Sequence, residues 1–131
     1  IHLLILSFID KNKVDTCTVC KFFGDNLIKQ SFKELKSKLF KNNELTDLRL
    51  NKLINLVKLD ISWNNTITDG GISTLVNLTS MKLNNVVKIT DNGIFNLTNI
   101  TSLSLISNRI ITNHGISKLI NITSFDIIIV I

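Results

Sequence analysis

The chain has 131 residues, of which 44% are hydrophobic and 19% are charged. This composition excludes an intrinsically disordered segment and suffices for one domain, or for a small module joined to a larger one. The net charge is +5, but the positive charges do not form a cluster. The first 44 residues contain eight lysines interspersed with five acidic residues, and the remaining residues contain seven basic and five acidic side chains. Without a dense basic stripe, we expect no nucleic-acid partner.

The first nine residues, IHLLILSFI, form an apolar run without a preceding basic residue. The run is too short to span a membrane and lacks the cleavage site of a complete signal peptide. Because the chain does not begin with Met, we expect it to be a fragment of a longer protein. We expect a protein of the cytoplasm, and also of the nucleus. The alternative is that the apolar run is a truncated signal sequence and that the protein is secreted.

Two short apolar segments flank a polar turn in residues 1–30. The first contains Ile5, Leu6, Ser7, Ile9 and Asp10, and the second contains Val19, Cys20, Lys21 and Phe23. This pattern resembles the F-box, a small helical module in which Trp usually stands at the position of Phe23. The resemblance implies a Skp1-like adaptor as partner, bound by Ile5, Leu6, Ile9, Val14, Val19, Cys20 and Phe23.

Residues 31–52 form a separate segment in our prediction. Ser31 and Glu34 have capping-box spacing, and apolar residues at 32, 35, 39 and 40 share one helical face. We therefore expect a helix over 31–40 that shields the first repeat. The leucines at 45, 48 and 50 precede a similar pattern at Leu56 by only eleven residues, fewer than a parallel crossover requires. This stretch is predicted to be a degenerate repeat, an N-terminal cap or the scar of a deletion.

Three ungapped 22-residue segments begin at Leu53, Leu75 and Leu97, and a partial fourth begins at Leu119. In each, two apolar residues spaced by two, such as Leu59 and Ile61, predict a short strand. A single unit cannot bury all its apolar residues, whereas stacked units bury a continuous column.

The loops ITDGGI, ITDNGI and ITNHGI recur at the same spacing, and only Gly71, Gly93 and Gly115 repeat among their glycines. A phosphate-binding loop would need its own helix and a lysine or hydroxyl at set positions. A recurring glycine beside an inward isoleucine instead predicts a tight bend or a close approach between stacked coils. We expect Asp69, Asp91 and Asn113 to cap these turns.

The pattern L-x-x-L-x-L-x-x-N, followed by I-T-D-x-G-I, resembles the leucine-rich repeat family from residue 53 to the end. The resemblance implies parallel strands on a concave face, with Asn64 and Asn108 turned inward to bind loop backbone. Val86 replaces this asparagine in the middle unit, which predicts a weaker backbone ladder there. The expected fold class is an α/β solenoid: a small helical F-box-like module (1–30), a capping helix with linker or degenerate repeat (31–52) and a leucine-rich repeat horseshoe (53–131).

No arrangement of residues supports catalysis. Cys17 and Cys20 form a lone C-x-x-C without the second ligand pair of a zinc site, and His114 occupies a variable loop position. We predict no enzyme activity, cofactor, metal, membrane or small-molecule ligand. Five N-x-S/T sequons are attributed to repetition and to the abundance of asparagine, at residues 64, 77, 96, 99 and 121.

The strand residues that point away from the core are the candidate binding surface. Their central column has mixed charge, which suits a specific protein partner. The residues predicted to bind there are Arg49, Lys58, Asp60, Lys82, Ser104 and Asp126. A merely solvated sheet face is the alternative. Together the two resemblances imply a substrate receptor of a cullin-type ubiquitin ligase, whose target remains unidentified; the alternative is a leucine-rich interaction or adhesion protein without a ligase role.

Overall fold

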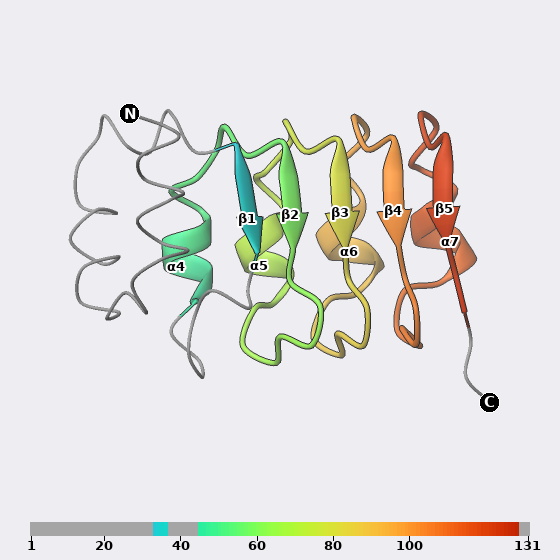
Figure 1. Ribbon diagram of the computed structural model, residues 1–131, viewed down its shortest axis with the longest axis horizontal. Helices are drawn as coiled ribbons and strands as arrows, with labels where there is room; N and C mark the ends of the chain where they lie inside the picture. The colour runs from blue at the N-terminus through green and yellow to red at the C-terminus, as the bar shows by residue number, and fades with distance from the viewer. Residues whose placement is uncertain (1–32, 37–44, 129–131) are drawn as a thin grey trace, which may run out of the picture.

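The computed structural model describes residues 33–36 and 45–128. Its repeating unit is a coil that consists of one short strand, a loop, one turn of helix and a return segment (Figure 1). The strands are β1 (Glu34–Lys36), β2 (Lys58–Asp60), β3 (Ser80–Lys82), β4 (Ser102–Ser104) and β5 (Ser124–Asp126). The helices are α4 (Asp47–Leu50), α5 (Asp69–Ile72), α6 (Asp91–Ile94) and α7 (Asn113–Ile116).

The five strands form one parallel sheet in chain order, β1-β2-β3-β4-β5. From β2 onward the register advances by one sequence repeat per strand, so that Leu59 pairs with Met81 and Met81 with Leu103. Because every coil repeats the same apolar positions, each central strand residue stacks on its equivalent in the next coil. The helices lie in a parallel row on the opposite side of the coils (Figure 1).

The core fills the space between the sheet and the helices. Within one coil, the buried side chains come from the strand, the loop and the helix alike: Leu56, Leu59, Ile61, Ile67, Ile72 and Leu75. Burying each of these side chains contributes about 1.5–3 kcal/mol relative to leaving it in water. Phe125, in the last strand, remains 39% exposed because no described coil covers that side.

The helix predicted over 31–40 is wrong at Glu34–Lys36, which form β1 and pair in parallel with β2. Leu35 lies opposite Leu59 and is buried, so it begins the same core column. Local capping-box spacing and helical periodicity are weak preferences, and here the burial of Leu35 against the neighbouring strand outweighs them. The rest of that predicted helix lies outside the described residues, as does the F-box-like module of residues 1–30.

The leucines at 45, 48 and 50 belong to the helical side of the coil that starts with β1. Thr46 and Asp47 stand one repeat before Thr68 and Asp69, and α4 packs beside α5 as α5 packs beside α6. Leu45 and Leu50 are buried, whereas Leu48 is exposed. The same spacing of leucines therefore occurs in two different parts of a coil, and the Thr-Asp pair distinguishes them.

In the described part of the chain, no helix is both long enough and apolar enough to cross a membrane.

Candidate protein-binding face

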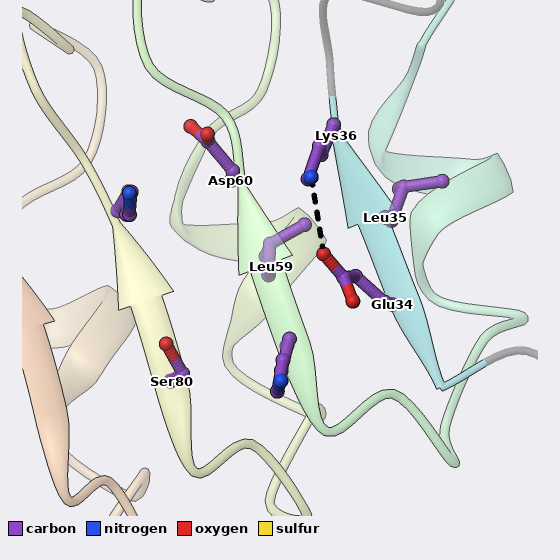
Figure 2. Close-up of a pocket in the computed structure, with 8 residues that line it drawn as sticks. Glu34, Leu35, Lys36, Leu59, Asp60 and Ser80 are labelled. Carbon is purple, nitrogen blue, oxygen red and sulfur yellow. Dashed lines mark ion pairs between the residues drawn. The ribbon is translucent and has the colours of Figure 1, made fainter. Parts of the chain in front are cut away.

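The sheet face that points away from the helices carries the candidate site; it corresponds to the face expected to be concave and is called the concave face below. At its β1–β3 end, strand residues on either side of the buried leucines line a shallow hollow of about 430 Å³ (Figure 2). The hollow is lined by Glu34, Leu35, Lys36, Lys58, Leu59, Asp60, Ser80 and Lys82. Three of the predicted site residues, Lys58, Asp60 and Lys82, are thus brought together.

The charges in this hollow are only partly paired. Lys36 Nζ lies 3.3 Å from a Glu34 carboxylate oxygen, and both side chains are 46% exposed (Figure 2). Such a solvated pair contributes at most about 1 kcal/mol. Asp60 Oδ1 accepts a hydrogen bond from the backbone N–H of Ser62 at 3.1 Å. Within the described ranges, no ion pair involves Lys58 or Lys82, so both cations are available to a partner.

The β4–β5 end of the face is different. Ser102, Ser104 and Ser124 replace the lysines, and Asp126 is the only charged strand residue. Ser104 is buried, and its hydroxyl donates to Asn84 Oδ1 at 2.8 Å, which also accepts from the Ile106 N–H. Ser104 therefore stabilises the stacking of two coils and offers no free hydroxyl to a partner.

Arg49 was assigned to the concave face, and that assignment is wrong. Arg49 lies in α4, on the helical side of the coils. The residue that occupies its expected place in the central column is Lys36, which pairs in register with Asp60. The prediction failed because the leucines around Arg49 were aligned with strand leucines rather than with the loop and helix residues Ile67 and Ile72.

The loops that begin at Thr46, Thr68, Thr90 and Thr112 link each coil to the next. Asp47 accepts hydrogen bonds from the Thr68 backbone N–H at 2.9 Å and from its hydroxyl at 2.6 Å. Asp69 accepts the equivalent bonds from Thr90 at 2.7 and 2.6 Å, and Asp91 accepts them from Thr112. The expected capping role of the aspartates is therefore corrected: each aspartate binds the following coil. The helix N-cap is the threonine, whose hydroxyl accepts a backbone N–H in α5, α6 and α7.

The recurring glycines make room for these aspartates. A Cβ atom at Gly71, Gly93 or Gly115 would lie 2.4 Å from a carboxylate oxygen of the preceding coil's aspartate. None of these three glycines has a positive φ angle. Close approach between stacked coils therefore explains them, and a tight bend does not.

Asp91 shows the electrostatic consequence of this arrangement. Burial tends to raise the pKa of its carboxyl group, but hydrogen bonds from the Thr112 hydroxyl and backbone N–H act in the opposite direction. A hydrogen bond from the Gly115 N–H and the charge of His114 act in the same direction as Thr112. The net result is a pKa below the ordinary value, because these partners stabilise the charged form.

The inward asparagines bind backbone as predicted. Asn64 Oδ1 accepts from the N–H groups of Thr66 and Ile67 at 2.9 and 2.8 Å. The Asn108 amide donates to two carbonyls of the preceding coil, and its oxygen accepts from Ile110 and Ile111. Val86 is buried in the same column but has no side-chain acceptor. The Val86 N–H lies 3.4 Å from the Leu83 carbonyl oxygen, whereas the Asn64 N–H lies 3.0 Å from that of Ile61. The longer distance agrees with the weaker ladder predicted for this coil.

Three of the sequon asparagines are structural. The side-chain amides of Asn77, Asn99 and Asn121 donate to backbone carbonyls of the preceding coil at 2.8–2.9 Å. This asparagine ladder accounts for the recurrence of the N-L-T and N-I-T sequences independently of glycosylation.

One exposed residue was missed by the sequence analysis. Trp63, just after β2, is 73% exposed and has a φ of 65°, in the left-handed region. Asn85 and Ser107, at the same position of the next coils, share this conformation. The sequence did contain a signal for this residue: the equivalent positions of the next two repeats hold small polar residues, Asn85 and Ser107, and only this one holds a tryptophan.

The described residues contain no group of three or more His, Cys, Asp or Glu side chains placed to hold a metal ion. His114 is exposed in α7 and contacts the Thr112 hydroxyl through its backbone N–H. Cys17, Cys20 and His2 lie outside the described residues.

Comparisons with known proteins agree with this geometry. Residues 52–76 match the family described as Leucine Rich repeat. An internalin from Listeria monocytogenes strain 4b F2365 has a similar structure, with 27% sequence identity and a TM-score of 0.51. The similarity covers 60% of this chain and only 24% of the internalin chain. No curated protein matched the sequence. The described part of the chain has the fold of a leucine-rich-repeat solenoid, with parallel strands in one row and short helices in another.

Proposed function

We propose that this chain is a non-catalytic module that binds another protein on its concave face. The observation that carries the proposal is the hollow over β1–β3, where Lys58 and Lys82 have no ionic partner among the described residues. The strand backbones beneath are paired in register, so their outward side chains are held at fixed spacing on one surface. The similarity to leucine-rich repeat proteins supports the same interpretation.

Site-specific photocross-linking tests this function. A photoreactive amino acid is placed at Ser102 on the concave face and, as a matched control, at Asn92 in the exposed part of α6. We expect one protein to cross-link from position 102 but not from position 92. Equal cross-linking from both positions, or from position 92 alone, would contradict a concave binding site.

We propose further that the bound protein is the target of a cullin-type ubiquitin ligase for which this chain is the substrate receptor. Support comes from the F-box-like residues, Ile5, Leu6, Ile9, Val14, Val19, Cys20 and Phe23. In this arrangement a Skp1-like adaptor binds the N-terminal module while the repeats hold the target near the conjugating enzyme. The effect of the chain is then to raise local concentration, with no chemistry of its own. Such a receptor acts in the cytoplasm or the nucleus.

Binding to a purified Skp1-like adaptor tests the ligase role. Ile9→Asp and Val19→Asp are each expected to abolish co-purification, because a buried charge in the contact would remain unpaired. Lys82→Ala, which lies on the repeats, serves as the control and retains adaptor binding. Absence of binding by the natural sequence, extended at its N-terminus, would rule out this role while leaving the concave interaction site intact.

The second candidate is a leucine-rich interaction or adhesion protein without a ligase role. The specific observation in its favour is that an internalin is among the solved structures similar to this chain. If this chain is secreted by a eukaryotic cell, its sequons predict a mass that decreases on endoglycosidase treatment. An unchanged mass together with adaptor binding would favour the ligase receptor.

A further inference from the structure

Trp63 is held in its unusual backbone conformation by the stacking of the coils. Its backbone N–H donates to the Asn84 carbonyl at 2.9 Å, and Asn85 and Ser107 make the equivalent bonds at 3.0 and 2.8 Å. These bonds extend the parallel ladder past the ends of the strands. The fold therefore requires a left-handed residue here, but it does not require an indole.

A tryptophan is poorly suited to this position. Left-handed backbone is strained for a bulky side chain, whereas Asn tolerates it, as Asn85 illustrates in the next coil. With 73% of its surface exposed, Trp63 contributes little to the core. A large, exposed aromatic residue with few conformational degrees of freedom is the type that most often dominates the energy of a protein interface.

The place of Trp63 relative to the hollow adds a second observation. Lys82 ends β3, and Asn84, the backbone partner of Trp63, follows two residues later. Lys58 begins β2, so Lys58, Lys82 and Trp63 succeed one another along the strand direction. Lys82 is in register with Asp60, so Lys58 and Lys82 are two strand positions apart along this direction, or about 7 Å. Trp63 follows Asp60 by three residues, past the end of β2.

We propose that Lys58, Lys82 and Trp63 form a docking site for an extended acidic segment of a protein. Two carboxylates, two residues apart, contact the two lysines, and an apolar side chain about three residues beyond them packs on the indole. This inference rests on the concave-face function proposed above and specifies its partner. Glu34 and Asp60 line the same hollow and repel any anion, but a peptide with two separated carboxylates meets less of this repulsion than a continuous polyphosphate, so the mixed charge favours the peptide.

Fluorescence provides a direct assay, because Trp63 is the only tryptophan of the chain. The probe is an eight-residue synthetic peptide with Asp and Glu two positions apart and Leu three positions after the Glu. We expect a saturable change in tryptophan emission that weakens as salt is raised. A control peptide with Asn and Gln in place of the acids is expected to leave the emission unchanged. Equal responses to both peptides, or to neither, would overturn the proposal.

Variants then separate binding from stability. Anisotropy of a labelled peptide follows binding without the tryptophan signal. Trp63→Asn is expected to raise Kd at least about tenfold while the midpoint of unfolding stays equal or rises, because Asn suits the left-handed backbone. The double variant Lys58→Ala and Lys82→Ala is expected to raise Kd about three- to tenfold. Lys52→Ala, an exposed lysine after α4, is the matched control and leaves Kd unchanged.

The outcomes distinguish this inference from the broader function. If a protein cross-links at position 102 but the acidic peptide does not bind, the acidic chemistry is wrong and the concave site stands. If the peptide binds with Trp63→Asn as tightly as with Trp63, the docking site is elsewhere. Tighter binding of a single-stranded oligonucleotide than of the peptide would replace the proposed partner with a nucleic acid.

Discussion

The helical side and the concave side of the coils differ in how their residues repeat. Thr68, Thr90 and Thr112 each bind an aspartate of the preceding coil through the same two hydrogen bonds. The central column of the concave face instead runs Lys36, Asp60, Lys82, Ser104 and Asp126. Since stacking imposes the same geometry on every coil, a residue that recurs is explained by stacking. Apart from Ser104, whose hydroxyl binds Asn84 of the preceding coil, the residues of this column change because stacking does not fix them, and they can serve a partner.

The strongest test of this contrast is Gly93→Val. The new side chain would occupy the space of the Asp69 carboxylate, which lies 2.4 Å from the position of a Cβ atom. We expect a loss of about 3 kcal/mol in the free energy of unfolding, from overpacking and from the hydrogen bonds that Asp69 must give up. Urea denaturation measures this loss.

Gly70→Ala is the control for that substitution. Gly70 lies in α5, and a Cβ atom there would be 3.6 Å or more from its nearest neighbours. Because alanine is a better helix former than glycine, we expect unchanged or slightly increased stability. Equal losses for the two glycines would show that backbone freedom, and not the approach of the aspartate, explains the repeated glycine.

Asp69→Ala is expected to cost about 2 kcal/mol, because the Thr90 N–H and hydroxyl lose their acceptor. Asn113→Ala provides the comparison at the same position of α7, where no side-chain hydrogen bond of Asn113 is found among the described residues. We expect a change below about 0.5 kcal/mol there. Circular dichroism measures the thermal unfolding midpoints of both variants. An equal decrease in the two midpoints would contradict a stabilising role for the aspartate–threonine bonds.

The lowered pKa of Asp91 predicts a smaller effect at acid pH. A carboxyl group whose pKa is lower in the folded state contributes stability that is fully present above its unfolded pKa. That stability is lost as the pH falls through the folded value. Below pH 4, the natural protein should therefore lose stability more steeply than Asp91→Asn. If the unfolding midpoints of the natural protein and of Asp91→Asn depend on pH in the same way, the charge of Asp91 does not cause the loss of stability at acid pH.

The smallest stability effect is expected on the concave face. Lys58→Ala and Lys82→Ala remove exposed charges that have no ionic partner among the described residues, so each should change the free energy of unfolding by less than about 0.5 kcal/mol. The same substitutions should weaken partner binding, which is the opposite of the pattern expected for Gly93→Val. A destabilisation comparable to that of Asp69→Ala would mean that the lysines serve stacking after all.

Much of the solenoid could be predicted from repetition alone. Leu59, Met81 and Leu103 were recognised as one core column because apolar residues at a fixed interval can be buried only by stacking. The inward role of Asn64 and Asn108 followed from the resemblance to leucine-rich repeats, and both bind backbone in the structure. Lys58, Asp60 and Lys82 were assigned to the outer side of their strands by the alternation of a β-strand.

The first described coil could not be predicted in the same way. Its strand and its helix are separated by a different number of residues from those of later coils, so the gapless alignment that revealed the other repeats excludes it. Local signals then dominated: the Ser31–Glu34 spacing indicated a helix, and the leucines around Arg49 indicated a strand. Pairing of Leu35 with Leu59 and packing of α4 on α5 reverse both assignments.

The sequence by itself determined the repeat length and the core columns, because these depend on residue types at fixed spacing. Only the tertiary structure decided which residues of neighbouring coils meet. It assigns the Asp-Thr-Gly contact to stacking rather than to turn capping, moves Arg49 off the binding face and joins the backbone of Trp63 to Asn84, two residues after Lys82. These contacts join residues about one repeat apart, and their geometry depends on how the coils stack rather than on any local pattern.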